Sequence, residues 1–110
     1  IVLSQAVTYV ACAPKSNAAS QAIFGAMDSV KNKKTSVPSH LQDAHYKGSG
    51  ELGHGTGYQY AHDFPYHYVK QQYLPSELEG SVFYEPTDMG YEQKIREYLS
   101  FLHSRDKKQP

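Results

Sequence analysis

Residues 1–34 read IVLSQAVTYVACAPKSNAASQAIFGAMDSVKNKK, and this stretch decides the fold class. Residues 1–13 would be apolar on nearly every side of a helix, which is typical of a helix that is buried or packed against several neighbours. Pro14 ends this helix, because proline has no amide to donate within a helix. Ser16 or Asn17 can cap a second helix by accepting hydrogen bonds from the free amides of its first turn. The chain therefore opens with two predicted helices joined by a short turn.

The second predicted helix has an apolar stripe that consists mostly of alanine. Its members recur at spacings of three and four, the period of one helix face: Ala18, Ala19, Ala22, Ile23, Ala26, Met27 and Val30. Because four of these seven are alanines, another helix could approach closely. The basic run at residues 31–34 ends the helix, where the helix dipole favours positive charge.

A third helix is predicted near the C-terminal end, with Thr87 or Asp88 as its cap. An apolar stripe follows at the helical period: Tyr91, Ile95, Tyr98, Leu99 and Leu102. Glu92 and Arg96 have the spacing of a helical ion pair worth roughly 0.2–0.5 kcal/mol. We expect the polar tail at residues 105–110 to fray.

The middle of the chain is irregular and rich in tyrosine. Residues 38–42 could form a single helical turn, and five glycines between residues 48 and 57 predict a loop. Residues 57–61 alternate weakly and are the candidate partner of residues 81–84 in a short β-hairpin. The predicted fold class is therefore mainly α, a small helical domain with an irregular tyrosine-rich middle and at most one short β-hairpin.

Composition excludes several classes of protein. Eleven basic and eleven acidic residues cancel, which argues against binding nucleic acid by general electrostatics. No apolar run approaches the roughly 18 residues that cross a membrane. The single cysteine, Cys12, rules out an internal disulfide, and its apolar neighbours predict a buried, inert thiol. The chain suits one domain over residues 1–110, and its start at Ile1 inside an apolar segment indicates a fragment of a longer protein whose first helix is entered partway.

The histidines do not form a convincing metal site. His62 and His67, with Asp63 beside the first, could be offered as ligands, but no cysteine pair or His-Glu-x-x-His motif supports them. A hydrogen bond between His62 and Asp63 that orders the loop, and that could respond to pH, is the preferred interpretation. We expect no metal.

Two other arrangements resemble catalytic or cofactor sites only superficially. Residues 53–57, GHGTG, lack the lysine and the strand–helix context of a phosphate-binding loop. Ser39, His40 and Asp43 lack the strained turn and oxyanion site of a serine hydrolase. The sequence therefore predicts neither an enzyme nor a bound cofactor in this chain.

The tyrosines are the stronger signal, since five fall within sixteen residues: Tyr58, Tyr60, Tyr66, Tyr68 and Tyr73. Tyrosine is enriched at protein interfaces because it buries a large ring and keeps a polar tip. Stacking on bases of single-stranded nucleic acid is the rival use, but it needs interleaved basic residues and this stretch has only Lys70. A subunit interface is favoured, and a purely structural role in packing the irregular middle stays open.

Six motifs in order carry a resemblance that spans residues 10–102: APKSNA (13–18), VPSHLQDAHY (37–46), LGHGTGYQYAHD (52–63), QQYLP (71–75), FYEP (83–86) and GYE (90–92). Together they resemble the C-terminal domain of the AAA+ ATPase family that includes bacterial replication-associated recombination protein A and the eukaryotic Werner helicase-interacting protein. The resemblance implies a non-catalytic, collar-like helical domain, similar to that of clamp loaders, which assembles the protein into a homotetramer.

The same resemblance implies what the longer protein does. Its N-terminal ATPase module would bind ATP and magnesium, and its partners would be DNA and single-strand-binding protein at stalled replication forks, in the cytoplasm near the nucleoid and without a membrane. Within this chain the candidate interface or partner-binding residues are His54, Tyr58, Tyr60, His62, Asp63, Gln71, Gln72 and Tyr73. The alternative function is a module that binds single-stranded nucleic acid or a replication protein.

Overall fold

The computed structural model describes residues 1–43, 45 and 55–108. Three α-helices, α1 (Val2–Cys12), α2 (Ala18–Val30) and α3 (Glu92–Arg105), are joined by irregular segments. Single 3₁₀ turns punctuate these segments and follow α3: η1 (Ser39–Leu41), η2 (Ala61–Asp63), η3 (Pro65–His67), η4 (Ser76–Leu78) and η5 (Asp106–Lys108). The described residues contain no strand, which confirms the mainly α fold class.

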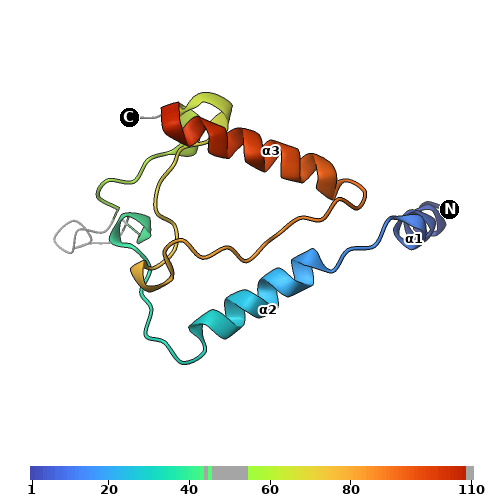
Figure 1. Cartoon of the computed structure of the whole chain (residues 1–110), viewed down its shortest axis with the longest axis horizontal. Coiled ribbons are helices and arrows are strands. Elements are labelled where there is room, and N and C mark those ends of the chain that lie inside the picture. Colours follow the sequence, from blue (N-terminus) through green and yellow to red (C-terminus); the bar gives the residue numbers. More distant parts are fainter. Residues whose placement is uncertain (44, 46–54, 109–110) are drawn as a thin grey trace.

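The helices form an open frame (Figure 1). In this frame α2 and α3 are two sides, the segment at residues 81–86 runs between them, and α1 lies beyond the N-terminal end of α2. The radius of gyration is 18.4 Å, whereas a compact domain of this length has about 13 Å. Among the described residues four apolar side chains are buried, those of Ala18, Val69, Leu78 and Leu102. The described part of the chain therefore lacks a large continuous core.

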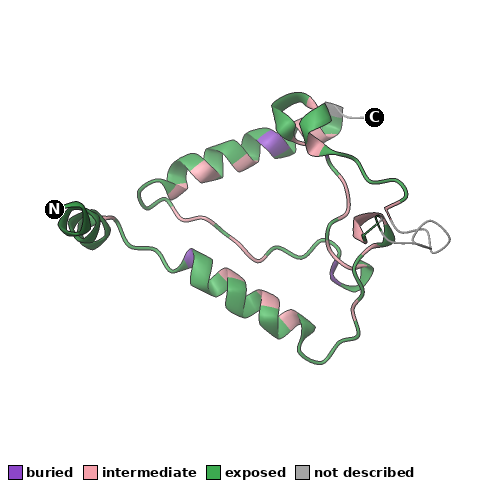
Figure 2. Ribbon diagram, turned by 180° about the vertical axis from the view of Figure 1, so that it is seen from behind, coloured by how far each residue is buried: buried purple, intermediate pink, exposed green. Residues whose placement is uncertain are grey.

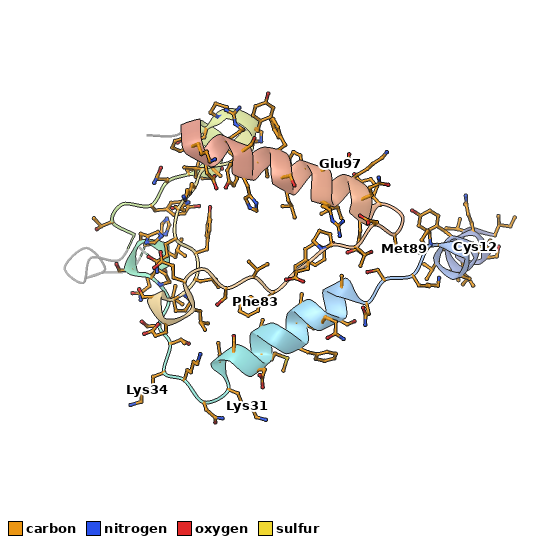
Figure 3. All side chains as sticks on the ribbon, viewed as in Figure 1. Cys12, Lys31, Lys34, Phe83, Met89 and Glu97 are labelled. Atoms are coloured by element: carbon orange, nitrogen blue, oxygen red, sulfur yellow. The ribbon has the colours of Figure 1, made fainter. Side chains whose placement is uncertain are left out.

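The first helix forms as predicted, but its predicted burial is wrong for this chain. Every residue of α1 is exposed, as the all-green helix in Figure 2 shows. Cys12 at the C-terminal end of α1 (Figure 3) is exposed too, so the prediction of a buried thiol is also wrong. The reason is that residues 13–17 lead α1 away from the frame. Local hydrogen bonds hold its end, from Lys15 Nζ to the carbonyls of Val10 (2.6 Å) and Ala11 (3.1 Å) and from the Ala13 amide to the Val10 carbonyl (3.4 Å).

The second helix begins and ends where the sequence predicts. The Ser16 hydroxyl accepts a hydrogen bond from the Ala18 amide at 3.1 Å, whereas the Asn17 side chain caps nothing. Ala18 is buried, and the segment that carries Phe83 runs along α2 (Figure 3). A Cβ atom at Gly25 would sit 3.8 Å from Phe83 Cδ1. Small side chains thus let this extended segment approach the helix.

The third helix begins four residues later than the nearer of its predicted caps. Thr87 Oγ1 accepts from the Met89 amide at 3.1 Å, and Gly90 has a left-handed φ of 58°. These residues form a turn that precedes the helix, so the chain enters α3 only at Glu92. Within α3 the predicted stripe is partly confirmed, since Leu102 is buried and Ile95 and Leu99 are half-buried, whereas Tyr91 and Tyr98 are exposed.

The predicted ion pair between Glu92 and Arg96 does not form. Arg96 pairs instead with Asp88 and donates from Nη2 to the Pro86 carbonyl at 2.6 Å. The Glu92 carboxylate does not pair with Arg96 because it accepts hydrogen bonds from three hydroxyl groups instead. Both side chains of the predicted pair thus bind partners that precede α3 in the sequence.

The starts of α2 and α3 meet at one polar junction around Glu92. Its carboxylate accepts from Tyr84 Oη at 2.7 Å and from Thr87 Oγ1 at 3.1 Å. A hydrogen bond from Ser16 is the largest cause that lowers the pKa of Glu92, followed by the bond from Tyr84. The junction therefore ties the start of α2 and the extended segment to the start of α3.

The polar tail is more ordered than predicted over its described part. Residues 106–108 continue α3 as η5, and Asp106 Oδ1 accepts from Tyr68 Oη at 2.6 Å. The prediction that this tail frays is therefore wrong as far as residue 108. Its last two residues lie outside the described residues.

Two glycine substitutions test the packing at the junction. We expect Gly90→Ala to lower the free energy of unfolding by about 1–2 kcal/mol, because alanine is strained at positive φ. Its Cβ would also lie 3.2 Å from Pro14 Cγ. Gly25→Ala is the matched control and should raise that free energy by up to about 1 kcal/mol, since its Cβ makes ordinary contact and alanine favours helix. Urea denaturation of both variants measures this, and equal effects would contradict the described junction.

Candidate partner-binding surface

The tyrosine-rich middle is held to the frame at three places. His40 Nε2 hydrogen-bonds the Gln72 carbonyl at 2.7 Å, which fixes η1 against the segment. Val69 and Leu78 are buried. These contacts fix the backbone of the tyrosine-rich middle and leave one of its sides exposed.

A side-chain amide takes the place of the predicted hairpin. Gln71 Oε1 accepts from the Gln59 amide at 3.2 Å, and Gln71 Nε2 donates to the Gln59 carbonyl at 2.8 Å. The same Nε2 donates to Tyr73 Oη at 3.0 Å. Because Gln71 satisfies both backbone groups of Gln59, residues 57–61 pair with this glutamine and not with residues 81–84. The candidate hairpin is therefore absent from the described residues, which agrees with the predicted limit of at most one.

These contacts bring most of the predicted site residues together. Tyr58, Tyr60 and Tyr73 are 50%, 54% and 55% exposed, and the Tyr60 ring lies 5.1 Å from the His62 ring. We name the tyrosine surface by six of the predicted residues: Tyr58, Tyr60, His62, Gln71, Gln72 and Tyr73. His54, a seventh, lies outside the described residues.

Two hollows adjoin the tyrosine surface. One of about 490 Å³ is lined by Lys70, Gln71, Gln72, Tyr73, Leu74, Glu79 and Gly80. The other, of about 400 Å³, is lined by His40, Leu41, Gln42, Asp43, His45, Gly55 and Tyr58. Each combines apolar and polar groups and could receive a side chain of a protein partner. The sequence analysis missed Leu74, Glu79 and Gly80, which line the first hollow. The turn η4 lies between Leu74 and these last two residues, and no local sequence pattern predicts that they line one hollow.

His62 and His67 contact each other through their rings. The ring centroids lie 4.7 Å apart, and within the described part of the chain no hydrogen bond joins His62 to Asp63. The predicted His62–Asp63 pair is therefore absent. The described residues contain no group of three or more side chains that could hold a metal ion. His40 hydrogen-bonds the Gln72 carbonyl, and Asp43 hydrogen-bonds His45.

Two of the five clustered tyrosines have a structural role. Tyr66 and His67 have left-handed φ angles of 59° and 52°. This backbone turns the Tyr66 ring edge-on to Phe101 at 5.0 Å and beneath the Arg105 guanidinium at 4.6 Å. Tyr68 bonds to Asp106. Tyr66 and Tyr68 thus make contacts that a purely structural role requires, although the Tyr66 side chain stays 58% exposed.

Burial raises the pKa of Tyr68 to about 12, and the hydrogen bond to Asp106 adds to the effect. The neutral phenol is the form that the fold stabilises. This stabilisation is fully present below the ordinary tyrosine pKa of about 10, and it is lost as pH rises through about 12.

Alkaline titration tests the Tyr68–Asp106 bond. Near-ultraviolet absorbance should show a tyrosine step at about 12, well above the ordinary tyrosine value of about 10. Tyr68→Phe should remove this late step, whereas Tyr73→Phe should leave it in place. A late step that survives in Tyr68→Phe would contradict the contact.

The chain is thus a small helical domain with an open frame. Its large exposed surface is suited to contact with other proteins. The family model for the C-terminal domain of MgsA AAA+ ATPases matches residues 1–103. The chain belongs to this family. The described residues contain no helix that is long and apolar enough to span a membrane.

Individual relatives agree with the family. The chain is 43% identical to an uncharacterised AAA domain-containing protein of Mycobacterium tuberculosis over 94% of its own length and 23% of the relative. It is 40% identical to the replication-associated recombination protein A of Bacillus subtilis and to that of Escherichia coli, over 96% and 98% of its length. It spans about a quarter of the length of each of these two relatives, whose sizes therefore leave room for an ATPase module outside the matched part.

Proposed function

We propose that this domain holds copies of a AAA+ ATPase together as a homo-oligomer, a tetramer as in the resemblance above. One observation carries the proposal: the chain exposes 9018 Å², whereas a compact monomer of 12.4 kDa exposes about 6,100 Å². The excess of about 2,900 Å² is large against the roughly 800 Å² per partner of a standard interface. Several interfaces could be built from it.

The tyrosine surface is the proposed partner-binding part of the irregular middle. Its rings are half exposed and their neighbouring amides are already ordered by Gln71 and His40. A surface that is ordered before binding loses less entropy when a partner docks. The 490 Å³ hollow beside Tyr73 would receive a side chain of the adjoining subunit.

The function of the oligomer is to concentrate activities that lie elsewhere in the longer protein. The ATPase module would bind ATP and magnesium, and DNA and single-strand-binding protein would be its partners at a damaged or stalled fork. Several modules linked through this domain act at one fork with a raised effective concentration. The domain itself contributes assembly and no chemistry, and its place of action would be the cytoplasm, near the nucleoid.

A second function, binding of single-stranded nucleic acid, draws on the same exposed rings of Tyr58, Tyr60 and Tyr73. Stacking on bases needs cationic groups that follow the phosphates. The hollow beside Tyr73 offers Lys70 but also Glu79, whose negative charge opposes a phosphate. Assembly is therefore the better supported function.

Removing two rings tests the tyrosine surface. Tyr60→Ala combined with Tyr73→Ala should weaken self-association about tenfold or more, because buried aromatic anchors contribute a large share of interface energy. Light scattering over a concentration series measures the shift, and Tyr91→Ala, also an exposed tyrosine, is the control. An unchanged mass would show that the tyrosine surface is not a subunit contact. A loss of binding to labelled single strands at low salt, with the mass unchanged, would favour the second function.

A further inference from the structure

Helix α2 is apolar on two opposite sides. At 100° per residue, the small residues Ala18, Ala22, Gly25 and Ala26 form one side of the helix. The large residues Ile23, Phe24, Met27 and Val30 form the other. A helix with apolar residues on both sides is normally covered on both.

Only the side with small residues is covered within this chain. Ala18 is buried, and Ala22 and Ala26 are half-buried beside the segment that carries Phe83. The large residues are open: Ile23 is 54% exposed, Phe24 64% and Met27 61%. The usual order is thus reversed, since the larger apolar side chains face solvent.

Nothing else in the described chain lies over this side of α2. Both views show α1 beyond the end of α2 and α3 on the far side of the frame (Figures 1 and 2). Helix α1 is exposed all round, so its geometry singles out no face for a partner. The face of α2 formed by Ile23, Phe24, Met27 and Val30, here called the outer face, is different because its opposite side is already packed.

We infer that the outer face of α2 packs against the same face of a second copy of this chain, in a two-fold symmetric helix pair. This inference rests on the proposed function and assigns one of its interfaces. Residues 18–30 contain a single charged side chain, Asp28, which lies away from the centre of the outer face. Two outer faces can therefore meet without burying an unpaired charge, which would be costly.

Symmetry and size agree with this occupant. A symmetric dimer places the same patch on both sides, so the patch must be complementary to itself. Aliphatic, aromatic and thioether groups of this size can interdigitate in this way when two helices cross. The excess exposed area of about 2,900 Å² also exceeds what one standard interface of roughly 800 Å² per partner would cover. The outer face and the tyrosine surface can therefore serve as separate contacts.

Opposite charges on two versions of the full-length protein test a contact between identical faces. Phe24→Asp with Met27→Asp makes an acidic version, and Phe24→Lys with Met27→Lys makes a basic one. Alone, each should show at least a twofold lower molar mass than the unmodified protein at the same concentration, because like charges then oppose each other across the two-fold axis. Mixed in equal amounts, they should regain the higher mass as heterodimeric contacts.

The controls separate this inference from its alternatives. Gln21→Asp adds one negative charge to α2 at an exposed position off the outer face, and it should leave the mass unchanged. Circular dichroism checks that the variants keep their helices. An unmodified protein that is monomeric would refute the proposed function itself. An oligomeric protein whose mass is unchanged in both charged versions would refute only the inference, as would charged versions that dissociate, or unfold, and do not recover when mixed.

Discussion

The arrangement of the frame depends on the hydrogen bonds that the Glu92 carboxylate accepts. The carboxylate accepts hydrogen bonds from Tyr84, Thr87 and Ser16, which belong to the extended segment, the turn before α3 and the start of α2. Because the described core is limited to a few residues such as Leu78 and Leu102, apolar packing alone does not fix the relation of α2 to α3. The polar junction at one corner therefore joins the two helices.

Such a frame leaves large apolar side chains exposed, where another protein surface could cover them. Tyr66 and Tyr68 contact the end of α3 and so dock the middle of the chain there. Tyr60 and Tyr73 remain half exposed, and so does the outer face of α2. The chain belongs to the family of C-terminal domains of MgsA AAA+ ATPases, and the proposed assembly role would cover these exposed groups.

Periodicity in the sequence predicted what depends on neighbours along the chain. The three helices, the stop at Pro14 and the single turn after Pro38 follow from local spacing and from proline geometry. Failures occurred where a distant partner decides the outcome. Glu92 was expected to bind Arg96, but its carboxylate accepts hydrogen bonds from hydroxyl groups of earlier segments. The candidate hairpin does not form, and one glutamine side chain, Gln71, hydrogen-bonds both backbone groups of Gln59.

Burial was the least predictable property, because an apolar helix has the same sequence pattern whether its own chain or another chain covers it. For α1 and Cys12 the expected burial is absent within this chain. We propose that copies of the chain supply the missing cover. The molar mass of the 110-residue chain, measured by light scattering across a concentration series, tests this directly. We expect at least twice 12.4 kDa, rising with concentration toward a tetramer, and a folded species of 12.4 kDa at every concentration would contradict self-association.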